Sequence, residues 1–201
     1  MKASSALIMI FLCSVIQPPL PAAAVLHASS SSTPPSAAAA KSFIYDTCNS
    51  ANNKTTSTCY GWLSGHAGDL EKLKVYKLVK LAMNLTLTEA KFVVKSIKDS
   101  GEKGLGDCLE TMGDCVDGVK MSLSQVKHLT PNQTEVLHLQ ISNLQTWMSA
   151  ALTDEDTCED EIGDVSDTGL KSLVADGIRN VSGHISITLA LINLFAHKCG
   201  F

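Results

Sequence analysis

The stretch that decides the fold runs from Asp107 to Val126 and reads DCLETMGDCVDGVKMSLSQV. Its apolar residues and cysteines recur at three- and four-residue steps, which places them along one face of an α-helix. They are Cys108, Met112, Cys115, Val119, Leu123 and Val126. Asp107 is a favourable residue for capping the start of this helix. The segment therefore predicts an amphipathic helix with one buried face.

The same period recurs on both sides of this segment. A preceding helix is expected from Asp69 to the glycines at 101, 104 and 106, which end it. Its apolar face would hold Leu70, Leu73, Val75, Leu78, Val79, Ala82, Leu85, Ala90, Val93 and Ile97. A following helix is expected to open at Thr130-Pro131-Asn132-Gln133, with Thr130 as N-cap and Gln133 completing a capping box. Its face would hold Leu137, Ile141, Leu144, Met148 and Ala151.

A last helix is expected from Asp167 to His197. Its apolar face would hold Leu170, Leu173, Val174, Val181, Ile185, Thr188, Ile192 and Phe195. Long amphipathic helices joined by short loops predict an all-α fold, an up-down-up-down four-helix bundle. Residues 41–66 are polar and include two cysteines, and we expect them to form a helical hairpin packed against the bundle.

The amino-terminal residues predict export. Lys2 precedes an apolar run from Ala6 to Ile16, then prolines at 18, 19 and 21 and the small residues 22–24. This is the order of a secretory signal peptide, expected over residues 1–27 with cleavage near residues 24–27. The run is too short to span a bilayer, so we expect a soluble, secreted mature protein. Residues 28–41 are Ser-, Ala- and Pro-rich and are expected to be a flexible lead-in to a domain over residues 42–201.

The cysteine count fits an exported chain. Outside the expected signal peptide the cysteines are Cys48, Cys59, Cys108, Cys115, Cys158 and Cys199. An even number favours disulfides, but the spacing alone does not choose the connectivity. Four glycosylation sequons are also present, at Asn53, Asn84, Asn132 and Asn180.

Sequence motifs of enzymes are absent. The chain contains no G-x-S-x-G, H-E-x-x-H, P-loop or dinucleotide-binding pattern. The acidic run from Asp154 to Glu161 lacks the spacing of a calcium loop, and the histidines show no metal-ligand spacing. We therefore expect no catalytic residues, no metal and no cofactor, and the modestly acidic composition gives no reason to expect nucleic acid.

Charge is divided unevenly along the chain. Residues 69–98 hold seven lysines and three acidic residues, whereas residues 99–167 hold fifteen acidic residues and three lysines. Glu110, Asp114 and Asp117 share one face of the helix that begins at Asp107. A concentrated acidic face of this kind favours a basic protein partner.

Two strings in the chain carry a family resemblance. GDCLETMGDCVD at residues 106–117 and NLQTWMSAALTDEDTCED at residues 143–160 resemble the plant invertase and pectin methylesterase inhibitor family. The resemblance extends from about Ser42 to the carboxyl terminus. It implies a helical hairpin on a four-helix bundle, with disulfides Cys48–Cys59 and Cys108–Cys158. Cys115 and Cys199 depart from the common pattern and would form either a third bridge or a pair of free thiols.

The resemblance implies an inhibitor in the plant cell wall or apoplast. Its target would be pectin methylesterase or, as the alternative, cell-wall or vacuolar invertase. Some invertase inhibitors carry a Pro-Lys-Phe segment that is missing from residues 127–134, and the string from Trp147 to Cys158 resembles the pectin methylesterase branch. The residues that resemble that branch's contacts are Glu110, Asp114, Asp117, Thr157 and Asp160. Another alternative is a relative of esterase pro-regions that retains or chaperones the enzyme.

Overall fold

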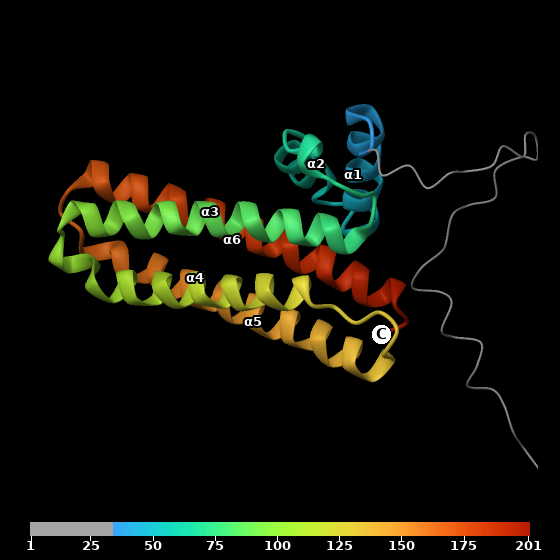
Figure 1. The fold of residues 1–201 in the computed structure, drawn as a ribbon. Coiled ribbons are helices and arrows are strands. Elements are labelled where there is room, and N and C mark those ends of the chain that lie inside the picture. Colours follow the sequence, from blue (N-terminus) through green and yellow to red (C-terminus); the bar gives the residue numbers. More distant parts are fainter. Residues whose placement is uncertain (1–33) are drawn as a thin grey trace, which may run out of the picture.

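The computed structural model describes residues 34–201, and the expected signal peptide lies outside them. Every regular element in this range is helical. The long helices are α3 (Val75–Ser100), α4 (Gly106–Lys127), α5 (Thr134–Glu161) and α6 (Thr168–Lys198). They form one elongated bundle in which each helix packs against the next and α6 returns to α3 (Figure 1). The predicted all-α bundle is confirmed.

A smaller helical pair lies against one end of the bundle. Helices α1 (Ala37–Ala51) and α2 (Thr56–Ser64) sit beside α3 and α6 in Figure 1, and α1 packs against α6. Their facing sides bury Ile44 and Leu63 completely. The disulfide Cys48–Cys59 joins the two helices, with Cα atoms 5.8 Å apart. The predicted hairpin and this disulfide are confirmed.

The junction between hairpin and bundle is aromatic. Trp62 of α2 stacks on the imidazole of His184 in α6, with ring centroids 3.9 Å apart and planes 5° from parallel. Nδ1 of His184 lies 2.9 Å from Oε2 of Glu89 in α3. Burial lowers the pKa of His184 and outweighs the opposing effect of the Glu89 carboxylate. One contact thus ties α2 to two helices of the bundle.

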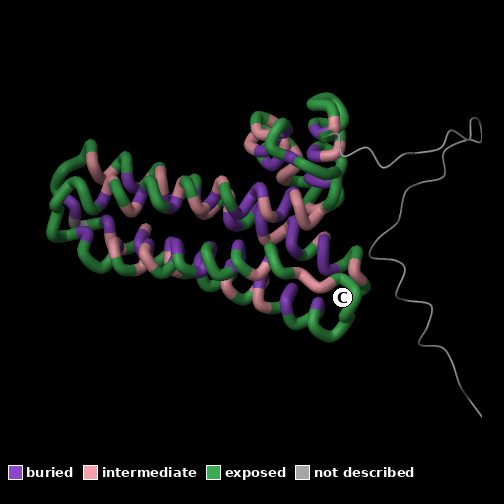
Figure 2. Tube along the Cα trace, viewed as in Figure 1, coloured by how far each residue is buried: buried purple, intermediate pink, exposed green. Residues whose placement is uncertain are grey.

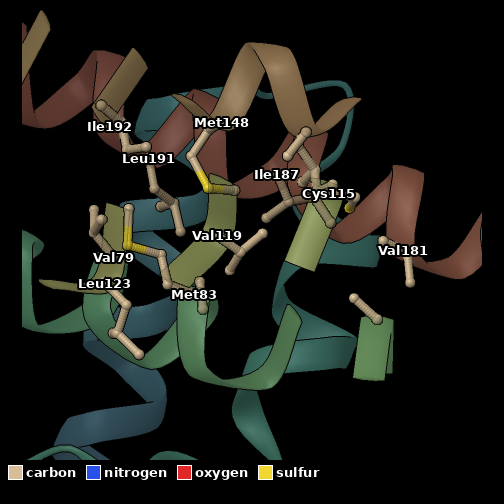
Figure 3. Close-up of a cluster of buried hydrophobic side chains, with 14 of the residues drawn as sticks. Val79, Met83, Cys115, Val119, Leu123, Met148, Val181, Ile187, Leu191 and Ile192 are labelled. Carbon is tan, nitrogen blue, oxygen red and sulfur yellow. The ribbon is translucent and has the colours of Figure 1, made fainter. Parts of the chain in front are cut away.

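Apolar residues at helical spacing form the centre of the bundle. The predicted faces of α4 and α5 are buried in full, from Cys108 to Val126 and from Leu137 to Ala151. Figure 2 shows the alternation of buried and exposed positions along each helix, and Figure 3 shows Met83, Val119, Met148 and Leu191 meeting in the core. Two residues predicted to lie on the buried faces of the first and last bundle helices do not: Leu73 and Leu173 are 40% and 52% exposed.

Short helical turns connect the long helices. These are η2 (Ala67–Asp69) before α3, η3 (Lys103–Leu105) before α4 and η4 (Ile162–Asp164) before α6. Gly101, with φ of 65°, takes the left-handed conformation that ends α3. The predicted start of the last helix near Asp167 is confirmed, and Asp167 is the N-cap of α6, since its Oδ1 accepts hydrogen bonds from the backbone N–H groups of Gly169 and Leu170.

Several predicted boundaries are wrong. Helix α4 begins at Gly106 with Leu105 as its N-cap residue, so Asp107, the predicted N-cap, lies in the first turn instead. Helix α3 begins at Val75 rather than Asp69. Leu70 has an extended backbone in the link before this helix, and its side chain is buried from that position. Helix α1 begins at Ala37, so residues 37–41, which we expected to be flexible, are helical. Ser36 Oγ caps this helix by accepting from the N–H of Ala39, and Ala40 is fully buried.

The predicted capping box at Thr130 is also wrong. Helix α5 begins at Thr134, with Gln133 as its N-cap residue. The side chain of Gln140 reaches back into the link instead. Its Oε1 accepts from the N–H and the hydroxyl of Thr130 at 2.9 and 3.0 Å, and its Nε2 donates to the carbonyl of His128 at 2.9 Å. These bonds hold Thr130 in the turn, where it cannot cap a helix.

Candidate functional site

The candidate site is built on the contact between α4 and α5. The two helices approach closely at Gly118, where an added Cβ would lie 3.0 Å from the carbonyl oxygen of Trp147 and 3.3 Å from Cβ of Ala151. Near the other end of the contact the disulfide Cys108–Cys158 joins the helices, with Cα atoms 4.2 Å apart. This confirms the second expected disulfide. Small residues and a covalent bond therefore fix how the outward side chains of α4 and α5 sit relative to each other.

All of the predicted contact residues are exposed on these two helices. Glu110, Asp114 and Asp117 lie on α4, and Thr157 and Asp160 lie on α5. Glu110 follows Cys108 by two residues, and Asp160 follows Cys158 by two, so the disulfide anchors both groups. The hydroxyl of Thr157 donates to the carbonyl of Thr153, so it is already engaged within its own helix.

The structure adds one carboxylate that the sequence reasoning did not select. Asp154 of α5 is partly buried, and its pKa is raised, first by that burial and then by the charge of Asp114 across the helix contact. The helical spacing of Asp154 and Thr157 could have indicated a shared side of α5. We call Glu110, Asp114, Asp117, Asp154, Thr157 and Asp160 together the acidic face.

Other acidic residues nearby are engaged elsewhere. Asp117 Oδ1 lies 2.7 Å from Nζ of Lys120, within the acidic face. On the far side of α5, Glu159 Oε1 lies 3.5 Å from Nη1 of Arg179 in α6, and Arg179 also pairs with Asp176. The acidic run of α5 is therefore divided between the outward face and the α5–α6 contact.

A buried carboxyl lies behind the acidic face. Glu155 has no exposed surface, and neither of its carboxyl oxygens has a hydrogen-bond partner among the described residues. Burial raises its pKa to about 7, and the neighbouring charges of Asp156 and Glu159 act in the same direction. The nearby hydroxyl of Ser182 in α6 acts in the opposite direction on this pKa, but it makes no hydrogen bond to the carboxyl and its effect is smaller than that of burial.

Cys115 is a buried free thiol in the same part of the core (Figure 3). Burial raises its pKa to about 12, and the charges of Glu155 and Asp154 add to the effect. The expected alternative of a bridge between Cys115 and Cys199 is therefore wrong. A thiol with so high a pKa, closed off from solvent, is not a reactive nucleophile.

The sequons lie at exposed asparagines. Asn53 is in the link between α1 and α2, and Asn132 is in the turn between α4 and α5. Asn84 and Asn180 are on α3 and α6. The Asn84 amide donates to the carbonyl of Lys80 at 3.0 Å.

Within residues 34–201 no cluster of three or more His, Cys, Asp or Glu side chains could hold a metal ion. None of the helices in that same range is long and apolar enough to cross a membrane.

Together these features define a class of protein, an all-α bundle with disulfide bonds and a charged, outward-facing helix pair. The chain matches the family described as plant invertase/pectin methylesterase inhibitor over residues 42–191. Pectinesterase inhibitor 11 of Arabidopsis thaliana is 35% identical over 168 residues, which cover 78% of this chain and 82% of that protein. The chain belongs to the plant invertase/pectin methylesterase inhibitor family.

Other comparisons cover different shares of the matched proteins. Pectinesterase inhibitor 10 of Arabidopsis thaliana is 33% identical over 163 residues, which make up 77% of this chain and 51% of that relative. A crystal structure of a mutant form of a pectin methylesterase inhibitor from Arabidopsis is 20% identical, with a TM-score of 0.47. That comparison covers 76% of this chain and 95% of the other.

Proposed function

We propose that this protein is a secreted inhibitor of pectin methylesterase in the plant cell wall. It binds the enzyme stoichiometrically, covers the substrate cleft and performs no chemistry of its own. Family membership and relatives named pectinesterase inhibitors support the choice of target. The signal-peptide pattern of residues 1–27 supports export.

The observation that carries the proposal is the acidic face itself. Its carboxylates, all exposed except that of the partly buried Asp154, lie on two helices that a disulfide and a close helix contact hold in place. A rigid surface loses little conformational entropy when it binds, so more of its interaction energy appears as affinity. Carboxylates arranged in this way attract a basic surface and speed its approach.

Titration of purified enzymes tests the target and the mode of binding. Pectin methylesterase and invertase are assayed side by side with increasing amounts of the secreted protein. We expect esterase activity to fall linearly to an end point at equimolar inhibitor, with invertase unaffected. Inhibition of invertase alone would reverse the assignment, and inhibition of neither enzyme would favour a role in retaining or chaperoning an esterase.

Substitution of the acidic face tests the surface. The variant E110Q/D114N/D117N removes three exposed carboxylates of α4, and the matched control D46N/E102Q/E135Q removes three exposed carboxylates elsewhere. Truncating a charged partner at an interface costs about 2–5 kcal/mol, so we expect clearly weaker inhibition by the first variant. The control should inhibit as the wild type does. If the first variant keeps full affinity and its helical circular dichroism, the acidic face is only a solubility surface.

Ionic strength provides a further check on the acidic face. Salt shortens the reach of its field, so raising the salt concentration should slow association more than it speeds dissociation. Measuring both rates by surface plasmon resonance separates the two effects. An association rate that does not depend on salt would argue against electrostatic steering.

A further inference from the structure

A second charged surface lies on α3, away from the acidic face. Polar side chains follow the helix from end to end at three- and four-residue steps, which places them in one line. They are Lys77, Lys80, Asn84, Thr88, Lys91, Lys95 and Lys98, and we call them the lysine stripe.

The lysine stripe points away from the bundle. The core residues of α3, such as Ala82, Ala90 and Val93, are each two positions from a stripe residue. Two positions correspond to about 200° around a helix with 3.6 residues per turn, so the stripe is on the opposite side from the core. From Lys77 to Lys98 it extends roughly 30 Å at the rise of an α-helix. It is therefore long and narrow, exposed from Asn84 to Lys98 and half-buried at Lys77 and Lys80.

A groove runs along the amino-terminal half of the lysine stripe. The link residues Asp69, Leu70 and Glu71 form one wall, and α3 forms the other with residues from Lys77 to Thr88. Lys77 Nζ lies 2.8 Å from Glu71 Oε2, which spans the groove. Hydrogen bonding to Lys77 and its charge lower the pKa of Glu71. The amide of Asn84 and the hydroxyl of Thr88 line the same groove as Lys80, and the groove also holds the carboxylates of Asp69 and Glu71 and three leucine side chains.

Part of the positive charge is not neutralised within the protein. Lys80, Lys91 and Lys98 have no ion pair among residues 34–201, although Lys95 pairs with Asp99. Phe92 lies beside Lys91 and is 59% exposed. An exposed aromatic ring offers an apolar surface that water solvates poorly.

We propose that the lysine stripe binds a linear polyuronate, a polysaccharide with a carboxylate on its sugar rings. Lysines at both ends attract the carboxylates, Asn84 and Thr88 meet sugar hydroxyls, and Phe92 packs on the apolar side of a ring. The choice of polymer rests on the proposed function, because hydrolysis of a methyl ester by the target enzyme leaves a carboxylate. The stripe would hold the inhibitor on de-esterified polymer while the acidic face stays available for the enzyme.

A membrane surface fits the lysine stripe less well than a polysaccharide does. A helix that lies on a bilayer presents a wide apolar face beside its cationic residues. The apolar residues of α3 are instead turned into the bundle, and Phe92 is the large apolar side chain of α3 that is more than half exposed.

A binding assay without enzyme tests the proposal separately from the proposed function. The secreted full-length protein is titrated with polygalacturonate and with the same polymer after complete methyl esterification. We expect binding only to the charged form, lost between about 50 and about 500 mM salt because screening removes the attraction of exposed charges. Equal binding to the neutral polymer, or no binding at low salt, would overturn the proposal.

Two matched variants locate the binding surface. K80Q/K91Q/K98Q neutralises the unpaired stripe lysines, and K54Q/K127Q/K198Q removes equal charge from exposed lysines elsewhere. Several exposed charge pairs lost together should weaken polygalacturonate binding about tenfold in the first variant. The control should bind like the wild type, and both should inhibit the esterase with unchanged affinity on a short soluble substrate. Equal weakening in both variants would show that net charge, not the stripe, binds the polymer.

Two further binding measurements test whether the lysine stripe prefers another anionic ligand. Polyglutamate binding as tight as polygalacturonate binding would contradict recognition of a sugar chain, and stripe-dependent binding to anionic phospholipid vesicles would favour a membrane instead. Mass spectrometry of the peptide that contains Asn84 completes the test. A glycan on Asn84 would cover the middle of the lysine stripe and would also overturn the proposal.

Discussion

The α1–α2 hairpin and the α4–α5 pair are both consecutive helices joined by a short link and a disulfide, but they differ in what supports them. Helices α1 and α2 have 15 and 9 residues, whereas α4 and α5 have 22 and 28. The hairpin disulfide spans 11 residues and the other spans 50. A unit as small as the hairpin cannot bury enough apolar surface alone, so it depends on its disulfide and on docking to α6.

The α4–α5 pair has the opposite balance. Its apolar faces supply much of the bundle core, and its disulfide connects helices that would also pack without it. What the bond adds is a fixed relation between outward residues, and these form the acidic face. We infer that the first disulfide holds the hairpin together, and that the second stabilises the bundle and fixes the relative positions of the residues in the acidic face.

The largest effect is expected from removing the α4–α5 disulfide. Closing a 50-residue loop stabilises by about 4 kcal/mol in the chain-entropy model, so C108A/C158A should lose about that much free energy of unfolding. Urea denaturation followed by circular dichroism measures the loss. A loss below about 1 kcal/mol would mean that this disulfide does not stabilise the bundle.

Removing the hairpin disulfide should lower the free energy of unfolding by a smaller amount and should affect mainly the hairpin. The shorter loop of Cys48–Cys59 corresponds to about 3 kcal/mol in the same model. In C48A/C59A we expect faster hydrogen exchange in α1 and α2, with protection retained in α4 and α5. Equal loss of protection in both regions would show that the hairpin and bundle unfold as one unit.

Glu155 makes the stability of the α4–α5 region depend on pH. Its pKa is raised from 4.5 to about 7 in the folded protein, so the folded state binds the proton more tightly than the unfolded state. The associated stability is present below pH 4.5 and is lost as pH rises through 7. Between about pH 5 and pH 8 the wild type should lose stability on the order of 2 kcal/mol, which E155Q should not.

The carboxyl of Glu155 interacts with groups on three helices: Cys115 of α4, Ser182 of α6, and Asp156 and Glu159 of α5. Each of these groups has a smaller effect on the pKa of Glu155 than burial does, so burial sets the direction of the shift. Thermal unfolding of both proteins across this pH range makes the comparison, with E135Q as an exposed control. The same pH slope in wild type and E155Q would remove Glu155 as the cause.

The smallest effect is expected at the hairpin–bundle junction. W62A removes the ring stacked on His184, and such aromatic contacts contribute about 0.5–1.5 kcal/mol beyond the buried area. Hydrogen exchange should rise in α2 while the bundle is unchanged, and F92A, at an exposed phenylalanine of α3, serves as the control. An effect of F92A on α2 as large as that of W62A would show that the stacked ring does not dock the hairpin.

Helices with uninterrupted apolar periodicity could be predicted from the sequence. The face from Cys108 to Val126 is buried as expected, because a 3.6-residue period sets which side chains share a side before any partner is known. The start of α6 near Asp167 was also predicted, and the bonds by which Asp167 caps it involve only the next turn of the chain. Both disulfides followed from a resemblance and not from the spacing of the cysteines.

The tertiary structure decided the features that depend on distant residues. Thr130 is held in a turn by Gln140, ten residues away, and Leu70 is buried from a link rather than a helix. For the candidate site, the sequence indicated that Glu110, Asp114 and Asp117 share a face. It could not show that Asp154 faces Asp114 or that Glu155 is buried, because the rotation of one helix against another is set by side-chain packing between them. Local periodicity thus determined the helices of this protein, and contact between helices decided which of their acidic residues face solvent, each other or the core.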